Sequence, residues 1–168
     1  MRGNGRYGLN ADSASLLTLT NLTSQNNTSS GIGQGNATVI ASGLTLENTG
    51  YGYFLSGGLA VIYNAAIRGN AVGVYAQSGD ISVDTATLQD NVTNIYAVNG
   101  NPQIQDSTFI CRNTDQPSHI NLNTLLSGDD FSQCAVPYLT VFGGTLPGPR
   151  TDPWLKFVQL FECLSSSS

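Results

Sequence analysis

Apolar side chains recur along the chain at an interval of 21 residues. Leu46, Ile67 and Leu88 follow this interval, and Ile110 continues the column after 22 residues. Three further columns keep the same register, and they are formed by Tyr53, Val74 and Ile95, by Ile62, Val83 and Ile104, and by Gly58, Gly79 and Gly100. Four columns in one register indicate a repeated structural unit that is stacked along the chain.

Within one unit, apolar positions alternate with other residues in three short segments. These segments contain Ile67, then Val74 and Ala76, then Ile81 and Val83. Asn70 and Gly79 stand at the breaks between them. Alternation over three to five residues between turn residues predicts strands, and three strands per coil predict three parallel sheets around one apolar column. Seven residues are therefore expected to be buried, namely Ile67, Val74, Ile81, Val83, Leu88, Ile95 and Ile104.

An asparagine follows three of these apolar residues, at the first turn of each unit. Asn70, Asn91 and Asn113 hold this position. Because asparagine tolerates turn conformations and hydrogen-bonds to neighbouring backbone, a stacked structural column is expected. The stretches 67–74 (IRGNAVGV) and 88–91 (LQDN) resemble the repeats of the right-handed parallel β-helix, or pectin-lyase-like, superfamily.

This resemblance covers about residues 37–122, with a looser first coil near residues 17–36. It implies an all-β, right-handed parallel β-helix of about five coils of 21–22 residues over residues 1–134. Members of the superfamily include polysaccharide lyases, hydrolases and epimerases, as well as noncatalytic surface proteins, so the resemblance implies a fold and leaves the function open.

Other parts of the chain depart from the repeat. Residues 23–36 are predicted to be a polar loop, and residues 135–168 are predicted to be a proline-rich irregular segment with an apolar helix after Asp152-Pro153. This helix would cap the solenoid or dock another chain. The glycine-rich residues 1–12 look like a poor cap, so the N-terminal end is expected to be covered by another chain, as in a homo-oligomer, or to continue a longer polypeptide.

Composition limits the partners and the compartment. Charged residues make up 10% of the chain and the net charge is -5, so there is no basic patch for nucleic acid or anionic membranes. No apolar run is long enough for a membrane span, and no signal peptide is visible. Cys111, Cys134 and Cys163 lack zinc-site spacing and allow one disulfide of undefined pairing. Five Asn-x-Ser/Thr sequons fit an extracellular or cell-surface protein, and they begin at Asn21, Asn26, Asn27, Asn36 and Asn91.

Candidate catalytic residues are few. His119 is the sole histidine, and Asp129-Asp130 is similar to the paired aspartates of polygalacturonases, although the other signatures of that family are absent. A turn is the alternative interpretation of Asp129-Asp130, and a structural role is the alternative for His119.

The other charged residues suggest structural roles. Arg68 and Arg112 are expected to pair with Glu47 and Asp90 of the preceding coil. No cofactor is expected. Calcium is a minor option, because four acidic residues of the coils, Asp80, Asp84, Asp90 and Asp106, fall at different coil positions.

One outward column is aromatic. Because Tyr53, Val74 and Ile95 point inward, the next residues, Phe54, Tyr75 and Tyr96, should point outward and stack along one face. Such a column is either a binding surface for sugars or proteins, or a ladder that only stabilises the sheet. We expect a noncatalytic extracellular module that binds glycan or protein. The alternative is a fragment or small member of a lyase, hydrolase or epimerase group acting on acidic polysaccharide.

Overall fold

The computed structural model describes residues 1–13, 16–111, 116–121, 123–134 and 139–142, and these form three parallel sheets. Sheet I contains β1 (Tyr7–Ala11), β4 (Ser30–Gln34), β7 (Tyr51–Leu55), β10 (Val72–Ala76), β13 (Thr93–Ala97), β16 (Gln116–Asn121) and β19 (Leu139–Phe142). Sheet II contains β2 (Leu16–Thr20), β5 (Thr38–Ser42), β8 (Leu59–Tyr63), β11 (Asp80–Asp84), β14 (Gln103–Gln105) and β17 (Leu125–Ser127). Sheet III contains β3 (Thr23–Gln25), β6 (Thr45–Glu47), β9 (Ala66–Arg68), β12 (Thr87–Gln89), β15 (Thr108–Cys111) and β18 (Asp130–Cys134).

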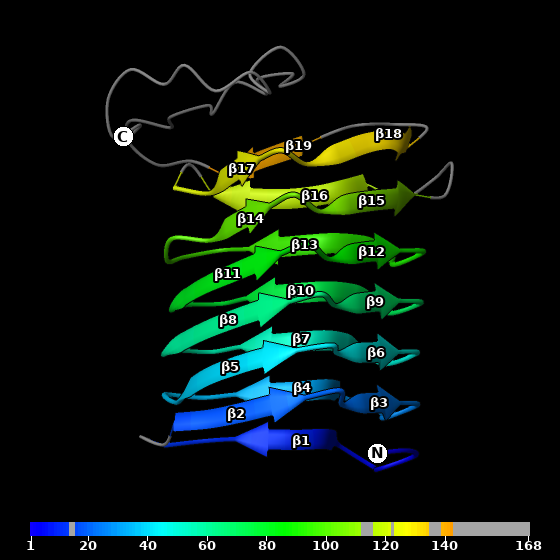
Figure 1. Ribbon diagram of the computed structural model, residues 1–168, viewed down its shortest axis with the longest axis vertical. Coiled ribbons are helices and arrows are strands. Elements are labelled where there is room, and N and C mark those ends of the chain that lie inside the picture. Colours follow the sequence, from blue (N-terminus) through cyan, green and yellow to red (C-terminus); the bar gives the residue numbers. More distant parts are fainter. Residues whose placement is uncertain (14–15, 112–115, 122, 135–138, 143–168) are drawn as a thin grey trace, which may run out of the picture.

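The chain winds through the three sheets in turn and climbs by one strand per sheet in each coil. In Figure 1 the near strands, such as β5 and β8, run from left to right as the chain rises, and the strands of sheet I return behind them, which makes the coil right-handed. The predicted all-β parallel solenoid is confirmed, with no helix in the described residues. About six coils are present where five were expected.

The predicted core is confirmed. The seven apolar residues expected to be buried, Ile67, Val74, Ile81, Val83, Leu88, Ile95 and Ile104, are at most 2% exposed. Their register is the predicted one, since Leu46, Ile67 and Leu88 are direct partners on β6, β9 and β12. Each buried aliphatic side chain contributes on the order of 1.5–3 kcal/mol, so the stacked coils stabilise one another.

One column member was assigned wrongly. The partner of Leu88 is Phe109 and not Ile110, so the interval stays at 21 residues. Phe109 is fully buried and stacks on Phe131 at 4.2 Å between ring centroids, while Ile110 is half-buried. Two adjacent apolar residues fit either register, and the larger aromatic ring fills the interior. Arg112 and Asn113, which were expected to pair with Asp90 and to extend the asparagine column, lie outside the described residues.

The polar loop predicted for residues 23–36 is also wrong, because these residues form β3 and β4. Ser24, Asn27 and Gln34 are buried, and their polar atoms are paired. Ser24 Oγ donates to the carbonyl of Gly31 at 2.9 Å and accepts from Asn27 Nδ2 at 2.9 Å, and Gln34 Nε2 donates to the carbonyl of Ala37 at 2.8 Å. Short polar side chains can therefore occupy the interior when hydrogen bonds satisfy them.

The N-terminal residues contribute strand pairs to the first coil. β1 pairs with β4, and the backbone of residues 1–3 bonds to β3, with Gln25 N donating to the carbonyl of Met1 at 2.8 Å. Leu17 and Leu19 of the edge strand β2 are half-buried, and Leu16 is 68% exposed. That another chain or a further segment covers this end stays a prediction.

Beyond residue 134, the structure describes only β19, which pairs with β16 and extends sheet I. The predicted capping helix after Asp152 lies outside the described residues.

Turns between the strands repeat from coil to coil. The turn that links sheets II and III places one residue per coil in the left-handed region, with φ between 47° and 69°. These residues are Asn21, Gly43, Asn64, Thr85, Asp106 and Gly128. Asparagine, aspartate and glycine are the residues that tolerate this conformation best, which explains the polar and glycine-rich breaks of the sequence repeat.

Candidate functional site

The outer surface of sheet I carries a column of rings. Phe54, Tyr75, Tyr96 and His119 are direct partners on β7, β10, β13 and β16. Their ring centroids lie 5.4, 5.3 and 5.3 Å apart in sequence order, and all four side chains are half-buried. The three aromatic residues selected from the sequence therefore stand side by side, one per coil.

Two members of this surface were missed in the sequence. Tyr51 packs on the column from the first position of β7, 5.3 Å from the Tyr75 ring and 5.5 Å from the Phe54 ring. His119 continues the column, but it follows Tyr96 by 23 residues, so a strict 21-residue register does not reach it. We call Tyr51, Phe54, Tyr75, Tyr96 and His119 the aromatic face.

Burial affects the ionisation of two rings on the aromatic face. Burial raises the pKa of Tyr75, and the neighbouring phenols Tyr51 and Tyr96 raise it further. Burial lowers the pKa of His119. Both shifts favour the uncharged ring, because desolvation penalises the charged form. An uncharged ring is suited to stacking on a flat apolar group.

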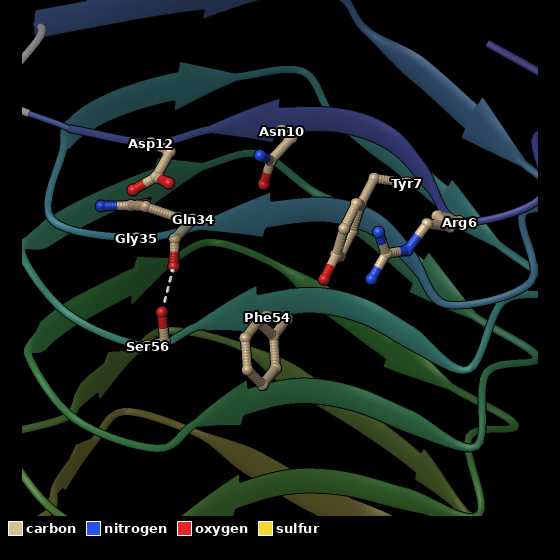
Figure 2. Close-up of a pocket in the computed structure, with 8 residues that line it drawn as sticks. All are labelled: Arg6, Tyr7, Asn10, Asp12, Gln34, Gly35, Phe54 and Ser56. Atoms are coloured by element: carbon tan, nitrogen blue, oxygen red, sulfur yellow. Dashed lines mark hydrogen bonds between the residues drawn. The ribbon is translucent and has the colours of Figure 1, made fainter.

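A hollow of about 320 Å³ adjoins the aromatic face at the Phe54 end. Its lining comes from β1, β4 and β7 and the residues beside them, and it consists of Arg6, Tyr7, Asn10, Asp12, Gln34, Gly35, Phe54 and Ser56 (Figure 2). Ser56 Oγ donates to the carbonyl oxygen of Gln34 at 3.0 Å, which ties the end of β7 to β4. Gly33 occupies the position of the ring column next to Phe54, so the column is interrupted at the hollow.

The catalytic candidates do not form one group. His119 belongs to sheet I and packs against Tyr96, with its ring centroid 5.3 Å from that of Tyr96. Asp130 begins β18 in sheet III and Asp129 directly precedes it, so the solenoid places them on a different face from His119.

Asp129 supports a turn, as the alternative interpretation expected. Its two carboxylate oxygens accept hydrogen bonds from the backbone N–H groups of Ser107, at 2.8 Å, and Ser127, at 3.1 Å. Burial raises the pKa of Asp129 to about 6. The two backbone hydrogen bonds oppose this shift, and the charges of Asp106 and Asp84 add to it. Asp130 is exposed, and hydrogen bonds from Ser132 lower its pKa.

Other charged groups have structural partners. The expected ion pair between Arg68 and Glu47 is present, and Glu47 also accepts a hydrogen bond from Gln25 Nε2 at 2.7 Å. Among the described residues, no three His, Cys, Asp or Glu side chains converge in a way that could hold a metal ion.

The structure assigns the disulfide that the sequence left open. Cys111 and Cys134 are partners on β15 and β18, with 4.4 Å between their Cα atoms, and they form a disulfide between adjacent coils. Cys163 lies outside the described residues.

The fold and this surface define a parallel β-solenoid with an aromatic outer face. Comparisons with protein-family models, with curated proteins and with solved structures find no match to this chain. The resemblance to pectin-lyase-like repeats therefore rests on the sequence pattern and the solenoid itself. Within the described part of the chain, no helix is long and apolar enough to cross a membrane.

Proposed function

We propose that this chain is a noncatalytic extracellular or surface module that binds a linear polysaccharide on the aromatic face. The observation that carries this proposal is the row of four half-buried rings, one per coil, at 5.3–5.4 Å. Pyranose rings have apolar C–H faces that stack on aromatic side chains. A periodic row of rings suits a periodic polymer, because each coil can contact one more unit of the chain.

The shape of the aromatic face favours a polysaccharide over a protein partner. Protein interfaces depend on a central anchor that fills a pocket, whereas these rings lie half-buried along the outer surface of one sheet. Tyr51 widens the row beside Phe54 and Tyr75 and extends the stacking area across the column.

The enzyme alternative, a lyase, hydrolase or epimerase acting on acidic polysaccharide, has less support. Such chemistry needs two or three ionisable groups converging on one substrate position. His119 lies in sheet I and Asp129 directly before β18 of sheet III, and both carboxylate oxygens of Asp129 accept backbone hydrogen bonds.

The extracellular part of the proposal is supported by the disulfide, because disulfides persist in oxidising compartments. The sequons give partial support. Asn27 and Asn91 are buried and hydrogen-bonded, so these two sequons are structural. Asn21, Asn26 and Asn36 are exposed and are the sites that could carry glycans.

A sedimentation assay with insoluble polysaccharides tests the proposal. Wild type, Tyr75→Ala and the control Tyr63→Ala, which removes a 40% exposed tyrosine from sheet II, are mixed with cellulose, chitin, xylan, mannan and pectate. We expect wild type and Tyr63→Ala to co-sediment with at least one polymer and Tyr75→Ala to remain in solution. Absence of wild-type binding, or equal binding by all three proteins, would overturn the proposal, and new reducing ends or unsaturated uronates would favour the enzyme.

A further inference from the structure

We propose that the hollow beside Phe54 is a subsite that selects an uncharged pyranose unit of the polysaccharide lying on the aromatic face. This inference rests on the proposed function and adds the class of sugar. The rings of the aromatic face can stack on neutral and acidic sugars alike. Selection therefore requires polar groups next to the rings, and the hollow supplies them (Figure 2).

Two glycines, Gly33 in β4 and Gly35 just after it, let two residues that line the hollow approach the backbone closely. A Cβ atom on Gly33 would lie 2.8 Å from Tyr7 Cδ1 and 2.9 Å from Tyr7 Cε1, so the Tyr7 ring covers the backbone where the column lacks a side chain. A Cβ atom on Gly35 would lie 2.3 Å from Asp12 Oδ1, so the Asp12 carboxylate rests against this second glycine. The absence of two side chains thus places an aromatic ring and a carboxylate against β4 at the end of the ring column.

The remaining groups complete a set for a polyhydroxylated ligand. The Arg6 guanidinium lies over the Tyr7 ring, 5.8 Å from its centroid, on the opposite side of the hollow from Asp12 (Figure 2). Asn10 stands between them, on the same strand as Tyr7. A carboxylate accepts hydrogen bonds from hydroxyl groups, a guanidinium donates hydrogen bonds to them, and an amide does both. Tyr7 and Phe54 offer ring surfaces for the apolar face of the sugar.

The balance of charge favours an uncharged sugar. Arg6 would attract a uronate carboxylate, but Asp12 would repel it, and the net charge of the chain is -5. Arg6 and Asp12 do not form an ion pair with each other, since the ion pair among the described residues joins Arg68 to Glu47. Arg6, Asn10 and Asp12 are all exposed, so a ligand can reach them.

A glycan array can separate this inference from the proposed function. The array carries hexamers of glucose, mannose and galactose, each beside its C6-oxidised uronate counterpart. The proteins are wild type, Asp12→Asn, Tyr75→Ala and the control Asp80→Asn, which changes an exposed carboxylate on sheet II. We expect wild type and Asp80→Asn to prefer at least one neutral hexamer over its uronate.

Asp12→Asn should weaken binding of that neutral hexamer by about tenfold, because hydrogen bonds to a charged acceptor are lost. It should also reduce the preference over the uronate, and a matching melting temperature would show that its fold is intact. Two results would overturn the subsite but not the proposed binding by the aromatic face. One is equal binding of neutral and oxidised hexamers, and the other is unchanged binding by Asp12→Asn while Tyr75→Ala loses binding. Absence of wild-type binding to every hexamer would overturn both proposals.

Discussion

Asn91 accepts two hydrogen bonds from Asn70 of the preceding coil through a single oxygen. The distances to its Oδ1 are 3.0 Å from the backbone nitrogen of Asn70 and 2.9 Å from Asn70 Nδ2. Asn91 Nδ2 in turn donates to the carbonyl of Ile67 at 2.9 Å and to Asn94 Oδ1 at 2.9 Å. Both asparagines are buried, so they form a polar stack beside the apolar core at the turns of two successive coils.

Replacing Asn91 by alanine should destabilise the solenoid by about 1–3 kcal/mol, because the buried backbone N–H of Asn70 would lose its acceptor. Urea unfolding measures this change as a lower midpoint. The matched control is Asn99→Ala, since Asn99 is exposed and its side chain donates a single hydrogen bond to the carbonyl of Gln77. Equal midpoints for the two variants would show that the asparagine column does not stabilise the coils.

A glycine column lies beside the asparagines. A Cβ atom on Gly52 would lie 2.5 Å from the carbonyl oxygen of Gly73 and 2.8 Å from Ile67 Cγ2. Gly52→Ala should therefore lower the free energy of unfolding by about 1–3 kcal/mol through overpacking. Gly5→Ala is the control, because no atom lies within 4 Å of the added carbon there. A melting temperature of Gly52→Ala equal to that of Gly5→Ala would mean that the coils do not approach this closely.

The disulfide should hold the last coils together. Cys111 and Cys134 are 23 residues apart, and closing a loop of this size stabilises a protein by about 3 kcal/mol. Cys111→Ser with Cys134→Ser should lower the thermal midpoint, whereas Cys163→Ser should preserve the Cys111–Cys134 link. A non-reducing peptide map checks the pairing directly. A peptide that links Cys163 to either of the other cysteines would contradict it.

Asp129 should make stability fall as the pH rises. Its pKa is raised from 3.8 to about 6 in the folded chain, so the folded state binds the proton more tightly than the unfolded state between these values. The contribution of Asp129 to stability should accordingly be fully present below about pH 4 and be lost as the pH rises through about 6. In Asp129→Asn this decline should be smaller, and melting temperatures across the range measure the difference. The opposite effect of Asp130 is common to both proteins, and identical pH profiles would refute the role of Asp129.

The sequence predicted most of the fold because the core is periodic. Residues such as Ile67, Val83 and Leu88 recur in register, and one coil defines the next. The prediction failed where polar residues face inward. Nothing in the composition of residues 23–36 indicates that Asn27 donates to Ser24 in the interior, or that Gln34 donates there to the carbonyl of Ala37.

The same periodicity predicted the aromatic column, but it did not predict the hollow beside Phe54 or the place of His119 in the column. The Tyr7 ring, which lines the hollow, lies against Gly33 although the strand partner of Gly33 is Asn10. The sequence repeat does not predict this contact. His119 was displaced from the strict register by an irregular interval in the sequence. The nonperiodic features of a solenoid cannot be predicted from the sequence repeat, even when the repeat predicts the coils.

Isothermal titration of the polysaccharide that wild type binds, using chains of two to six units, tests the aromatic face most directly. Affinity should rise with chain length until the polymer spans the row from Phe54 to His119, and then level off. Tyr75→Ala should weaken the longest chain by about two- to tenfold, which is the loss of one stacking contact. Tyr75→Phe and Tyr63→Ala should both match wild type, since the ring is kept in one and the face is untouched in the other. Affinity that is independent of chain length and unchanged in Tyr75→Ala, with a lower melting temperature for that variant, would show that the rings stabilise the sheet and bind nothing.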